Sequence, residues 1–385
     1  MSDYVRKETH LKNPIKSQLF HLDIELTERC NNNCIHCCIN LPEKDKSAKI
    51  REMTTEQIKD YLLQASKLGC MEVRFTGGEP LLRKDFEEIY IFTRKLGIKV
   101  LLFTNARLIT KSIIELFVRI PPLLPIEVTV YGMHKSSYEA VTRSLGSFSQ
   151  FWTGVKFLIE YKIPFYVKSA LLPPNKLEIN EFESWAKSLP GNNSNPGYSM
   201  YFDLRNRRDS EIKNDQIRKL RVTPEDGLQI ITRDREKYLI EMKQFTQKFM
   251  RPTGDRLFSC GAGRNITIDA YGNVQPCMGI RSPELIQKAG STLSESLLTF
   301  KQLSEIKATN PDYLLRCANC FIKGLCEQCP AKSWEEHGTF DKPVEYLCKV
   351  AHTQAYDLGL LNQNEKTWLL NPEEYKTRID RFVNS

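Results

Sequence analysis

A chain of 385 residues, of which 41% are hydrophobic and 26% charged, has a globular composition and is long enough for two or three domains. Its formal net charge of +8 is modest for this length and is spread through the predicted helices, so it permits an acidic peptide or nucleic acid partner without requiring one. Residues 1–18 lack an apolar core of signal-peptide length, and no other run approaches a membrane span. We therefore expect a cytoplasmic protein that does not enter a membrane.

Three of the twelve cysteines fall within eight residues, at Cys30, Cys34 and Cys37. In a reducing compartment such a cluster points to metal or redox chemistry rather than to disulfides. The apolar run that begins at Phe20 predicts a strand, so the C-x3-C-x2-C spacing lies on the loop after it. Three thiolates are one too few for a tetrahedral zinc site, but they can hold three corners of a [4Fe–4S] cluster and leave one iron open. Taken alone, the triplet also fits half of a zinc site.

A second motif, Gly77-Gly78-Glu79-Pro80, ends the next predicted strand at 71–76. The two motifs, in this order, resemble those of the radical S-adenosylmethionine (SAM) enzymes. The resemblance implies that the open iron chelates the amino and carboxylate groups of SAM. It also implies that the second motif lines the methionyl group, with the glycines allowing close backbone approach and the acid and main chain receiving the ammonium.

Three further positions match the SAM contacts of this family. Thr129 lies in a predicted strand at 126–131, where the family places a Ser or Thr that reaches SAM. Arg143 resembles the arginine that pairs with the SAM carboxylate, and His36 stands where the family often has an aromatic residue or His beside the adenine. The residues by themselves leave another interpretation open, in which Thr129 is a strand residue without a ligand and Arg143 is a solvated helix charge.

Predicted strands and helices alternate through the first half of the chain, which indicates right-handed crossover units and a parallel sheet of the α/β class. The strands are the run from Phe20 and residues 71–76, 99–105, 126–131, 165–171 and 198–204, and the helices are 54–68, 84–96, 112–120, 148–161 and 179–188. Six such units are short of a closed (β/α)8 barrel. They match the partial (β/α)6 TIM-like barrel of radical SAM enzymes, whose open side admits a large substrate.

A basic, weakly helical stretch at 205–221 follows the last predicted strand. A solvated face is its simpler interpretation, and a contact surface for an acidic substrate is the alternative. The stretch is also the only support for a nucleic acid partner, and it lacks the interleaved aromatic residues that stack bases. Helical spacing then resumes from Pro224 to Met250 and predicts a bridge out of the barrel.

A second group of seven cysteines occupies less than a quarter of the chain. Its members are Cys260, Cys277, Cys317, Cys320, Cys326, Cys329 and Cys348. Residues 266–274 alternate around Tyr271-Gly272 and predict a hairpin before Cys277. The spacing of the C-x2-C-x5-C-x2-C run alone also fits a four-cysteine zinc knuckle.

This segment resembles the SPASM domain, which holds two auxiliary iron–sulfur clusters in many radical SAM enzymes. The resemblance implies an outer cluster on Cys317, Cys320, Cys326 and Cys348, and an inner cluster on Cys260, Cys277 and Cys329. One departure is that two residues precede Cys329 where the family pattern often has three. Since two fully cysteine-bound clusters need eight thiolates and seven are present, the inner cluster is expected to have one iron without a cysteine ligand.

We therefore predict a partial barrel followed by a small Cys-rich SPASM domain with a β-hairpin and short helices. The expected boundaries are an N-terminal segment at 1–18, the barrel at 19–222, a helical bridge at 223–255, the SPASM domain at 256–350 and a helical tail at 351–385.

The resemblance implies an oxidoreductase in which a reduced cluster cleaves SAM and a 5′-deoxyadenosyl radical removes hydrogen from substrate. Auxiliary clusters suit a substrate radical that must then lose an electron. Our first hypothesis is maturation of a ribosomally made peptide (a RiPP) by a thioether, carbon–carbon or similar crosslink. The alternatives are Ser or Cys oxidation as in anaerobic sulfatase maturation, porphyrin-type cofactor biosynthesis and, from another class, an RNA-modifying or RNA-binding protein. No general base is assigned.

The expected partners are a peptide or protein substrate and a low-potential electron donor, flavodoxin or ferredoxin. About eighteen residues precede the first predicted strand, which leaves no room for a fused leader-binding domain. A separate leader-binding protein or the barrel itself would have to recognise a leader peptide.

Overall fold

The computed structural model describes residues 19–191 and 196–385, and the chain divides into two units. Unit 1 comprises Met1–Leu220 and Ala262–Lys301, and unit 2 comprises Arg221–Gly261 and Gln302–Ser385. The expected N-terminal segment at 1–18 lies outside the described residues.

An eight-stranded sheet forms the centre of unit 1, with the strand order β10-β9-β1-β4-β5-β6-β7-β8. Six of its strands are parallel and separated by helices, which confirms the predicted partial barrel. They are β1 (His21–Thr27), β4 (Glu72–Gly77), β5 (Lys99–Thr104), β6 (Ile126–Val130), β7 (Phe165–Ala170) and β8 (Gly197–Ser199). The last of these is shorter than the predicted strand, because Phe202 and Leu204 pack into a small core with Ile35 instead of pairing with β7.

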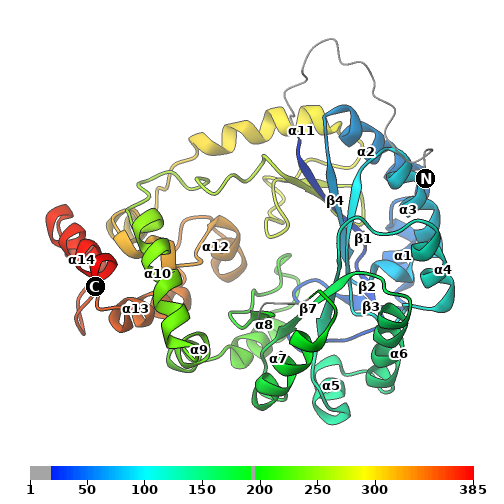
Figure 1. Ribbon diagram of the computed structural model, residues 1–385. Helices are drawn as coiled ribbons and strands as arrows, with labels where there is room; N and C mark the ends of the chain where they lie inside the picture. Colours follow the sequence, from blue (N-terminus) through cyan, green and yellow to red (C-terminus); the bar gives the residue numbers. More distant parts are fainter. Residues whose placement is uncertain (1–18, 192–195) are drawn as a thin grey trace. The chain divides into compact units, whose positions relative to one another are not determined.

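Helices cover the outer side of this curved sheet (Figure 1). They are α2 (Thr55–Lys67), α3 (Phe86–Lys95), α4 (Lys111–Arg119), α5 (Lys135–Thr142), α6 (Ser147–Glu160) and α7 (Ile179–Ser188). The predicted capping box is present at the start of α2, with Thr54 and Gln57 each bonded to the other's backbone N–H. The sequence analysis missed α5, because its two large buried apolar residues, Tyr138 and Val141, are too few to show a helical period.

The two faces of β1 differ in chemistry. Leu22, Ile24 and Leu26 are fully buried in the apolar core, whereas the alternate residues Asp23 and Glu25 carry charge on the opposite face. The remaining elements of unit 1 are β2 (Arg29–Cys30), β3 (Leu41–Pro42), α1 (Lys46–Arg51), η2 (Pro80–Leu82), η3 (Lys176–Glu178), α8 (Glu211–Leu220), β9 (Ile266–Ile268), β10 (Val274–Gln275) and α11 (Leu293–Phe300).

The predicted hairpin is formed by β9 and β10, but it packs with the barrel. Strand β9 runs parallel to β1 and extends the sheet by pairing Ile266 with Leu22 and Ile268 with Ile24. Because both isoleucines are fully buried at this edge, residues 262–301 belong to unit 1 instead of standing with the rest of the 256–350 segment. The spacing within a hairpin does not say which sheet edge it will extend.

Unit 2 is helical in its described residues. Its elements are α9 (Pro224–Ile231), α10 (Arg235–Phe249), η5 (Tyr313–Cys317), η6 (Phe321–Leu325), α12 (Pro330–His337), α13 (Glu345–Asp357), η7 (Thr367–Leu369) and α14 (Pro372–Asn384), with η4 (Lys301–Glu305) at its border with unit 1. The expected helical bridge is two helices, because the Asp234 side chain accepts a hydrogen bond from the Lys237 N–H and so caps a second helix that starts at Arg235. The expected tail packs into the same core as η6, with the rings of Tyr375 and Phe321 stacked at 5.1 Å.

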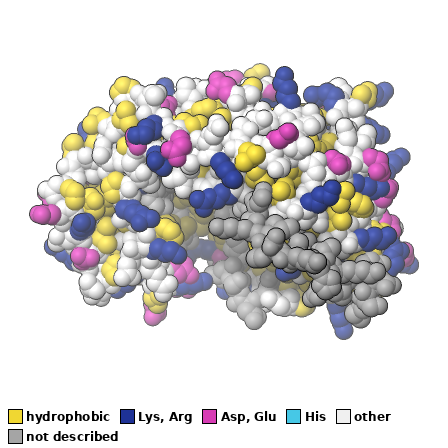
Figure 2. Space-filling model, turned by 90° about the horizontal axis from the view of Figure 1, so that it is seen from above, with side chains coloured by type: hydrophobic (Ala, Val, Ile, Leu, Met, Phe, Trp, Pro, Cys, Tyr) yellow, Lys and Arg dark blue, Asp and Glu magenta, His cyan; other side chains and the backbone are white. Residues whose placement is uncertain are grey.

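Within 19–191 and 196–385, none of the helices combines the length and the apolar character that crossing a membrane requires. On the face shown in Figure 2, Lys and Arg side chains lie scattered among Asp and Glu, as the modest net charge suggests.

Candidate active site

The loop that carries the first three cysteines is closed at its base by a short parallel ladder. Strand β2 pairs with β3, so that Arg29 faces Leu41 and Cys30 faces Pro42. The loop is fixed from the other side by α5, since the N–H groups of Asn33 and Ile35 donate to the carbonyls of Thr142 and Val141 at 2.8 and 3.0 Å. Residues 31–40 are therefore held at both ends.

The three thiols of this loop lie close enough to act on one another. Burial raises the pKa of Cys30 well above its usual range, and Cys34 and Cys37 raise it further. Burial also raises the pKa of Cys34 to about 12, again with a contribution from Cys37 and an opposing hydrogen bond with Tyr131. Without a metal the Cys30 and Cys34 thiols would stay protonated, whereas a coordinated thiol is deprotonated outright.

This arrangement fits a cubane cluster better than a single ion. In the part of the chain that the structure describes, no three His, Cys, Asp or Glu side chains converge on one point that would hold a metal ion. A [4Fe–4S] cluster does not require such convergence, because each cysteine binds a different iron. Three thiols at the C-x3-C-x2-C spacing on one loop, of which Cys34 is buried and Cys30 and Cys37 are half-buried, suit a cluster whose last iron stays open.

The Gly77-Gly78-Glu79-Pro80 motif lies directly against the base of the cysteine loop. The N–H groups of Gly78 and Glu79 donate to the carbonyls of Thr27 and Arg29 at 2.7 and 2.9 Å. A Cβ atom at Gly77 would lie 2.1 Å from the Thr27 oxygen, and one at Gly78 would lie 2.2 Å from the Arg29 oxygen. In the structure these glycines permit the close approach of the β1 and β2 backbone. Their predicted approach to SAM stays a prediction.

The Glu79 carboxylate is fully buried and serves as an internal anchor. It accepts hydrogen bonds from the Thr104 hydroxyl at 2.8 Å and from the N–H groups of Asn105 and Leu81 at 2.9 and 3.2 Å. Burial raises the pKa of Glu79 to about 7, although the Asn105 and Thr104 bonds oppose the rise. The motif is thus tied to the carboxyl ends of both β1 and β5.

We expect Gly78→Ala to destabilise unit 1 by about 1–3 kcal/mol, because its Cβ would overlap a backbone oxygen that cannot move alone. The shift in the midpoint of urea unfolding measures this cost. Gly197→Ala is the matched control, since a Cβ at Gly197 would meet no heavy atom within 4 Å. Equal stability of the two variants would show that the β1–β4 contact tolerates an added methyl group.

The cysteine loop is also held by Arg107, which the sequence analysis did not single out. Its Nη1 donates to the Asn31 carbonyl, to Asn32 Oδ1 at 2.6 Å and to Ser144 Oγ at 3.1 Å. Asn105, two residues earlier, donates from Nδ2 to Asn31 Oδ1 at 2.8 Å. Both residues follow β5, and residues just after parallel strands gather at one edge of the sheet. Their position directly after a predicted strand could have identified Asn105 and Arg107 from the sequence.

The three other predicted SAM contacts occupy different environments. The His36 ring packs against Tyr131 and Phe202 at 5.9 and 5.0 Å, and burial, with a smaller contribution from Lys213, lowers its pKa to about 4. Thr129 is half-buried on β6 and pairs with Lys168 on β7. Arg143 is exposed at the end of α5, where its φ of 50° places it in the left-handed region. Of these three residues, His36 thus lies on the cysteine loop itself, with its ring against two aromatic side chains.

The basic stretch at 205–221 is not a solvated face at its start. Arg205 is buried and donates to both carboxylate oxygens of Asp209 at 2.7 Å and to the Asn40 carbonyl at 3.4 Å. Lys213 donates to Asn40 Oδ1 at 2.5 Å, and both cations act electrostatically on Cys37 and Cys38. These cations are therefore committed to the cysteine loop, which removes most of the support for a nucleic acid partner.

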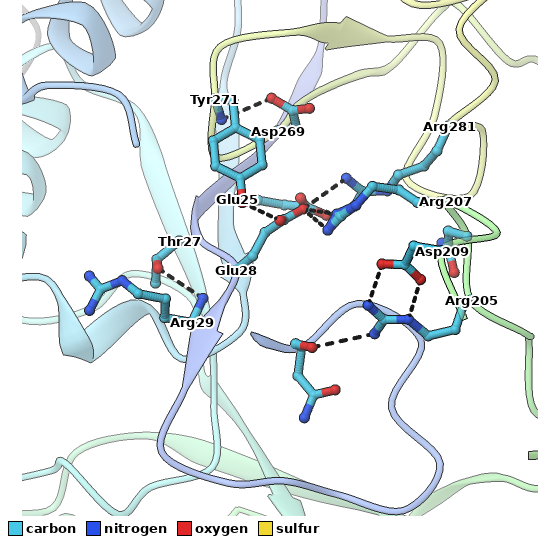
Figure 3. A network of polar contacts seen from close by, with 12 residues as sticks. Glu25, Thr27, Glu28, Arg29, Arg205, Arg207, Asp209, Asp269, Tyr271 and Arg281 are labelled. Atoms are coloured by element: carbon cyan, nitrogen blue, oxygen red, sulfur yellow. Dashed lines mark hydrogen bonds and ion pairs between the residues drawn. The ribbon is translucent and has the colours of Figure 1, made fainter. Parts of the chain in front are cut away.

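A second polar network lies beside the loop and is drawn in Figure 3. Glu28 accepts a hydrogen bond from the Tyr271 hydroxyl at 2.6 Å and pairs with Arg207. Arg281 pairs with Glu25 and lies 3.5 Å from Glu28. Because Tyr271 and Arg281 stand on either side of Cys277 in sequence, the network ties that hairpin segment to the start of the cysteine loop.

Burial shapes the charges of this network. It raises the pKa of Glu28, and Arg207 and Tyr271 oppose the rise. Burial lowers the pKa of Arg281, but Glu25 and Glu28 raise it by more, so this guanidinium stays charged. Two buried carboxylates are thus held by two cations and one hydroxyl. The sequence analysis did not predict this network.

The same concave face of the sheet carries further charges. Asp23 on β1 pairs with Arg74 on β4 at 3.1 Å. Arg74 and Lys168 lie 4.8 and 4.3 Å from the centre of the Phe103 ring, so two cations contact one aromatic ring. The face that the helices do not cover is therefore polar and can offer both donors and acceptors to a substrate.

The cysteines of unit 2 fall into two groups. Burial raises the pKa of Cys317 and of Cys320 to about 12, and the neighbouring thiolates of Cys326 and Cys348 raise both further. These four come from η5, the two ends of η6 and α13. Cys329 stands at the start of α12, where burial raises its pKa and Cys260 adds to the rise. This grouping does not match a zinc knuckle made of Cys317, Cys320, Cys326 and Cys329.

The structure thus combines a partial parallel barrel with three cysteines on the loop that follows its first strand. Residues 24–189 match the family model of the Radical SAM superfamily. The chain thus contains a radical SAM domain at residues 24–189. The cofactors of this family are SAM and a [4Fe–4S] cluster, and Cys30, Cys34 and Cys37 are suitably placed to hold the cluster.

Relatives in sequence include enzymes with different substrates. The AdoMet-dependent heme synthase of Methanosarcina barkeri is 23% identical over 344 residues, which cover 84% of this chain and 94% of the relative. The antilisterial bacteriocin subtilosin biosynthesis protein AlbA of Bacillus subtilis is 26% identical over 259 residues, which cover 67% of this chain and 54% of the relative.

Solved structures with the same fold cover nearly all of the chain. The structure of anSMEcpe with bound AdoMet and the Cp18Cys peptide has a TM-score of 0.58 at 15% identity, and the match covers 95% of this chain and 99% of that one. Streptococcus suis SuiB bound to S-adenosylmethionine has a TM-score of 0.61 at 16% identity, with 86% and 75% of the two chains covered. At these identities the likeness shows the fold.

Proposed function

We propose that this radical SAM enzyme oxidatively modifies a peptide. The observation that carries the proposal is the near-complete fold match to a SAM enzyme solved with a peptide bound, the Cp18Cys complex of anSMEcpe. SuiB has also been solved with its precursor peptide SuiA, at a TM-score of 0.50, and AlbA acts in bacteriocin biosynthesis. These relatives support a peptide substrate over a nucleic acid.

When bound, the reduced cluster supplies one electron to SAM and so generates the radical that removes hydrogen from substrate. Cys30, Cys34 and Cys37 would hold it, with Arg107 and Asn105 fixing their loop. Gly77, Gly78, Glu79 and Pro80 stay predicted contacts to the methionyl group, and His36 offers a ring for the adenine. Thr129 and Arg143 stay predicted SAM contacts.

Cys317, Cys320, Cys326 and Cys348 would hold an auxiliary cluster, a ligand set that the electrostatic effect of these thiols on one another supports. Such a cluster suits a reaction in which the substrate radical loses an electron after hydrogen removal. The inner set of Cys260, Cys277 and Cys329, with one iron lacking a cysteine, stays a prediction from the sequence. A crosslink in the peptide is the product that this electron loss favours.

The concave face of unit 1 offers polar groups that suit a peptide. Arg74 and Lys168 present cations above Phe103, and Glu25 has a buried oxygen, Oε2, without a hydrogen-bond partner in the described residues. A peptide backbone supplies both N–H donors and C=O acceptors for such a surface. These side chains would orient the chain and exclude water around the reacting carbon.

Mass spectrometry of a candidate peptide co-expressed with the enzyme tests this proposal. We expect the product to be lighter by about two hydrogens for each crosslink or carbonyl formed, because each oxidation removes two hydrogens from the substrate. The Cys30→Ala variant, co-expressed in the same way, should leave the mass unchanged. RNA binding that falls steeply with salt, without any change in peptide mass, would contradict the proposal and favour a nucleic acid substrate.

A porphyrin-type substrate is the second candidate, because the match to the M. barkeri heme synthase covers 94% of that protein. Incubation with SAM, dithionite and an iron porphyrin would reveal such an activity as a change in porphyrin mass. Ser or Cys oxidation, as in sulfatase maturation, also removes two hydrogens from a peptide. Fragment ions separate it from a crosslink, since a carbonyl changes one residue and a crosslink joins two.

A further inference from the structure

A group of exposed lysines lies on the outer side of the cysteine loop. Lys44, Lys46 and Lys49 come from the end of β3 and from α1, and Lys84 comes from the segment after the Gly-Gly-Glu-Pro motif. All four line one open hollow of about 530 Å³. We call these four residues the lysine surface.

The acidic residues beside the lysine surface are already committed to other contacts. Glu52 pairs with the buried Arg29 at 2.7 Å, and Asp85 pairs with Arg83 at 2.6 Å. Asp45 caps α1 through the N–H of Ala48 at 2.8 Å. None of the four lysines forms an ion pair with another described residue, and the remaining carboxylate of the hollow, Glu43, acts electrostatically on Arg29. The hollow is therefore positive.

This positive surface lies close to the cluster ligand Cys30. Pro42 pairs with Cys30 across the β2–β3 ladder, in which neighbouring strands are about 4.8 Å apart. Lys44 follows Pro42 by two residues, which span at most about 7 Å. The ladder is rigid, because Arg29 on β2 donates to the Glu43 carbonyl at 3.0 Å and to Glu52 on the far side of α1.

We propose that the lysine surface docks an acidic, low-potential one-electron carrier protein. The reaction needs one electron per SAM cleaved, so the carrier is oxidised by one electron and the cluster is reduced by one. A positive patch steers an acidic partner to the correct face and raises its association rate. Electron-transfer complexes have small, transient interfaces, which a patch of this size can supply.

The inference rests on the radical SAM chemistry and is independent of the substrate. An acidic segment of the peptide is the other partner that four free lysines could attract. A peptide that must reach the concave face has less use for this outer surface, whereas an electron carrier needs only to come close to Cys30. The two partners give different results in the test below.

Binding of oxidised flavodoxin to the triple variant Lys44→Glu/Lys46→Glu/Lys49→Glu tests the proposal. At low ionic strength we expect its affinity to fall by at least about tenfold relative to the unmodified enzyme, and 0.5 M salt should remove most of the difference. The control is Lys111→Glu/Lys156→Glu/Lys187→Glu, which makes the same charge change at exposed positions on α4, α6 and α7. It should keep the affinity of the unmodified enzyme.

SAM cleavage driven by dithionite should be the same in both triple variants, because a small reductant needs no docking surface. Equal flavodoxin affinities, or an equal loss in the control, would overturn the proposal. Loss of affinity for the peptide with unchanged affinity for flavodoxin would overturn it as well, and would assign the surface to the peptide. Failure of the peptide assay alone would leave the flavodoxin result intact.

Discussion

Replacing Cys30, Cys34 or Cys37 with alanine should abolish the formation of 5′-deoxyadenosine from SAM. Each thiol would bind a separate iron of the cluster, so removing one takes away the ligand of one corner. Anaerobically reconstituted enzyme with SAM and dithionite, analysed by liquid chromatography, measures the loss. Full cleavage in a variant that lacks all three cysteines would contradict the assigned role of the loop.

Cys70→Ala is the matched control for this experiment. Cys70 is buried just before β4 and donates a hydrogen bond to the Glu72 carbonyl at 3.1 Å, away from the carboxyl ends of the strands. The Cys70→Ala variant should retain the SAM cleavage activity of the unmodified enzyme. Iron analysis adds a second readout, since three clusters amount to about twelve irons per chain and the triple variant should keep about eight. Zinc in place of the remaining iron would rule out auxiliary clusters.

Replacing Arg281 with methionine should lower the free energy of unfolding by about 3–5 kcal/mol. The Arg281 and Glu25 side chains are each 2% exposed, so the variant would leave a buried carboxylate without its cation. Glu28 would keep its contacts with Arg207 and Tyr271, so Glu25 is the carboxylate most affected by the loss of Arg281. Urea unfolding followed by circular dichroism measures the change.

Arg119→Met provides the comparison for a solvated pair. Arg119 and Glu87 are 57% and 51% exposed, and such surface pairs contribute about 0–1 kcal/mol. The double variant Glu25→Gln/Arg281→Met should recover part of the lost stability, because it removes the unpaired charge. If Arg281→Met were no more harmful than Arg119→Met, the network would not hold the hairpin against β1.

The Glu25–Arg281 pair also connects the two cysteine-bearing segments of unit 1. Cys277 lies between Tyr271 and Arg281 on the hairpin side, and Glu28 lies two residues before Cys30. A change at Cys277 that moved Tyr271 or Arg281 would therefore alter the contacts of Glu28 at the start of the cysteine loop. This coupling follows from direct contacts and needs no motion elsewhere.

The sequence by itself determined the features that depend on short separations. The three thiols on one loop follow from spacing within eight residues, and the six β–α units follow from periodicity within each segment. The capping box at Thr54 and the hairpin around Gly272 are equally local. A pattern that repeats within a few residues is fixed by the backbone geometry of that element, so it can be recognised without knowing what packs against it.

Only the tertiary structure decided which side chains surround the cysteine loop. Lys213 reaches Asn40 across 173 residues, and Arg281 reaches Glu25 across 256. For the basic residues after the last predicted strand, the sequence analysis preferred a solvated face and kept a contact surface for an acidic substrate as the alternative, because composition does not reveal a buried partner so far along the chain. It also could not place β9 beside β1. These contacts depend on strand order and sheet edges, and therefore on the burial of many residues at once rather than on any single spacing.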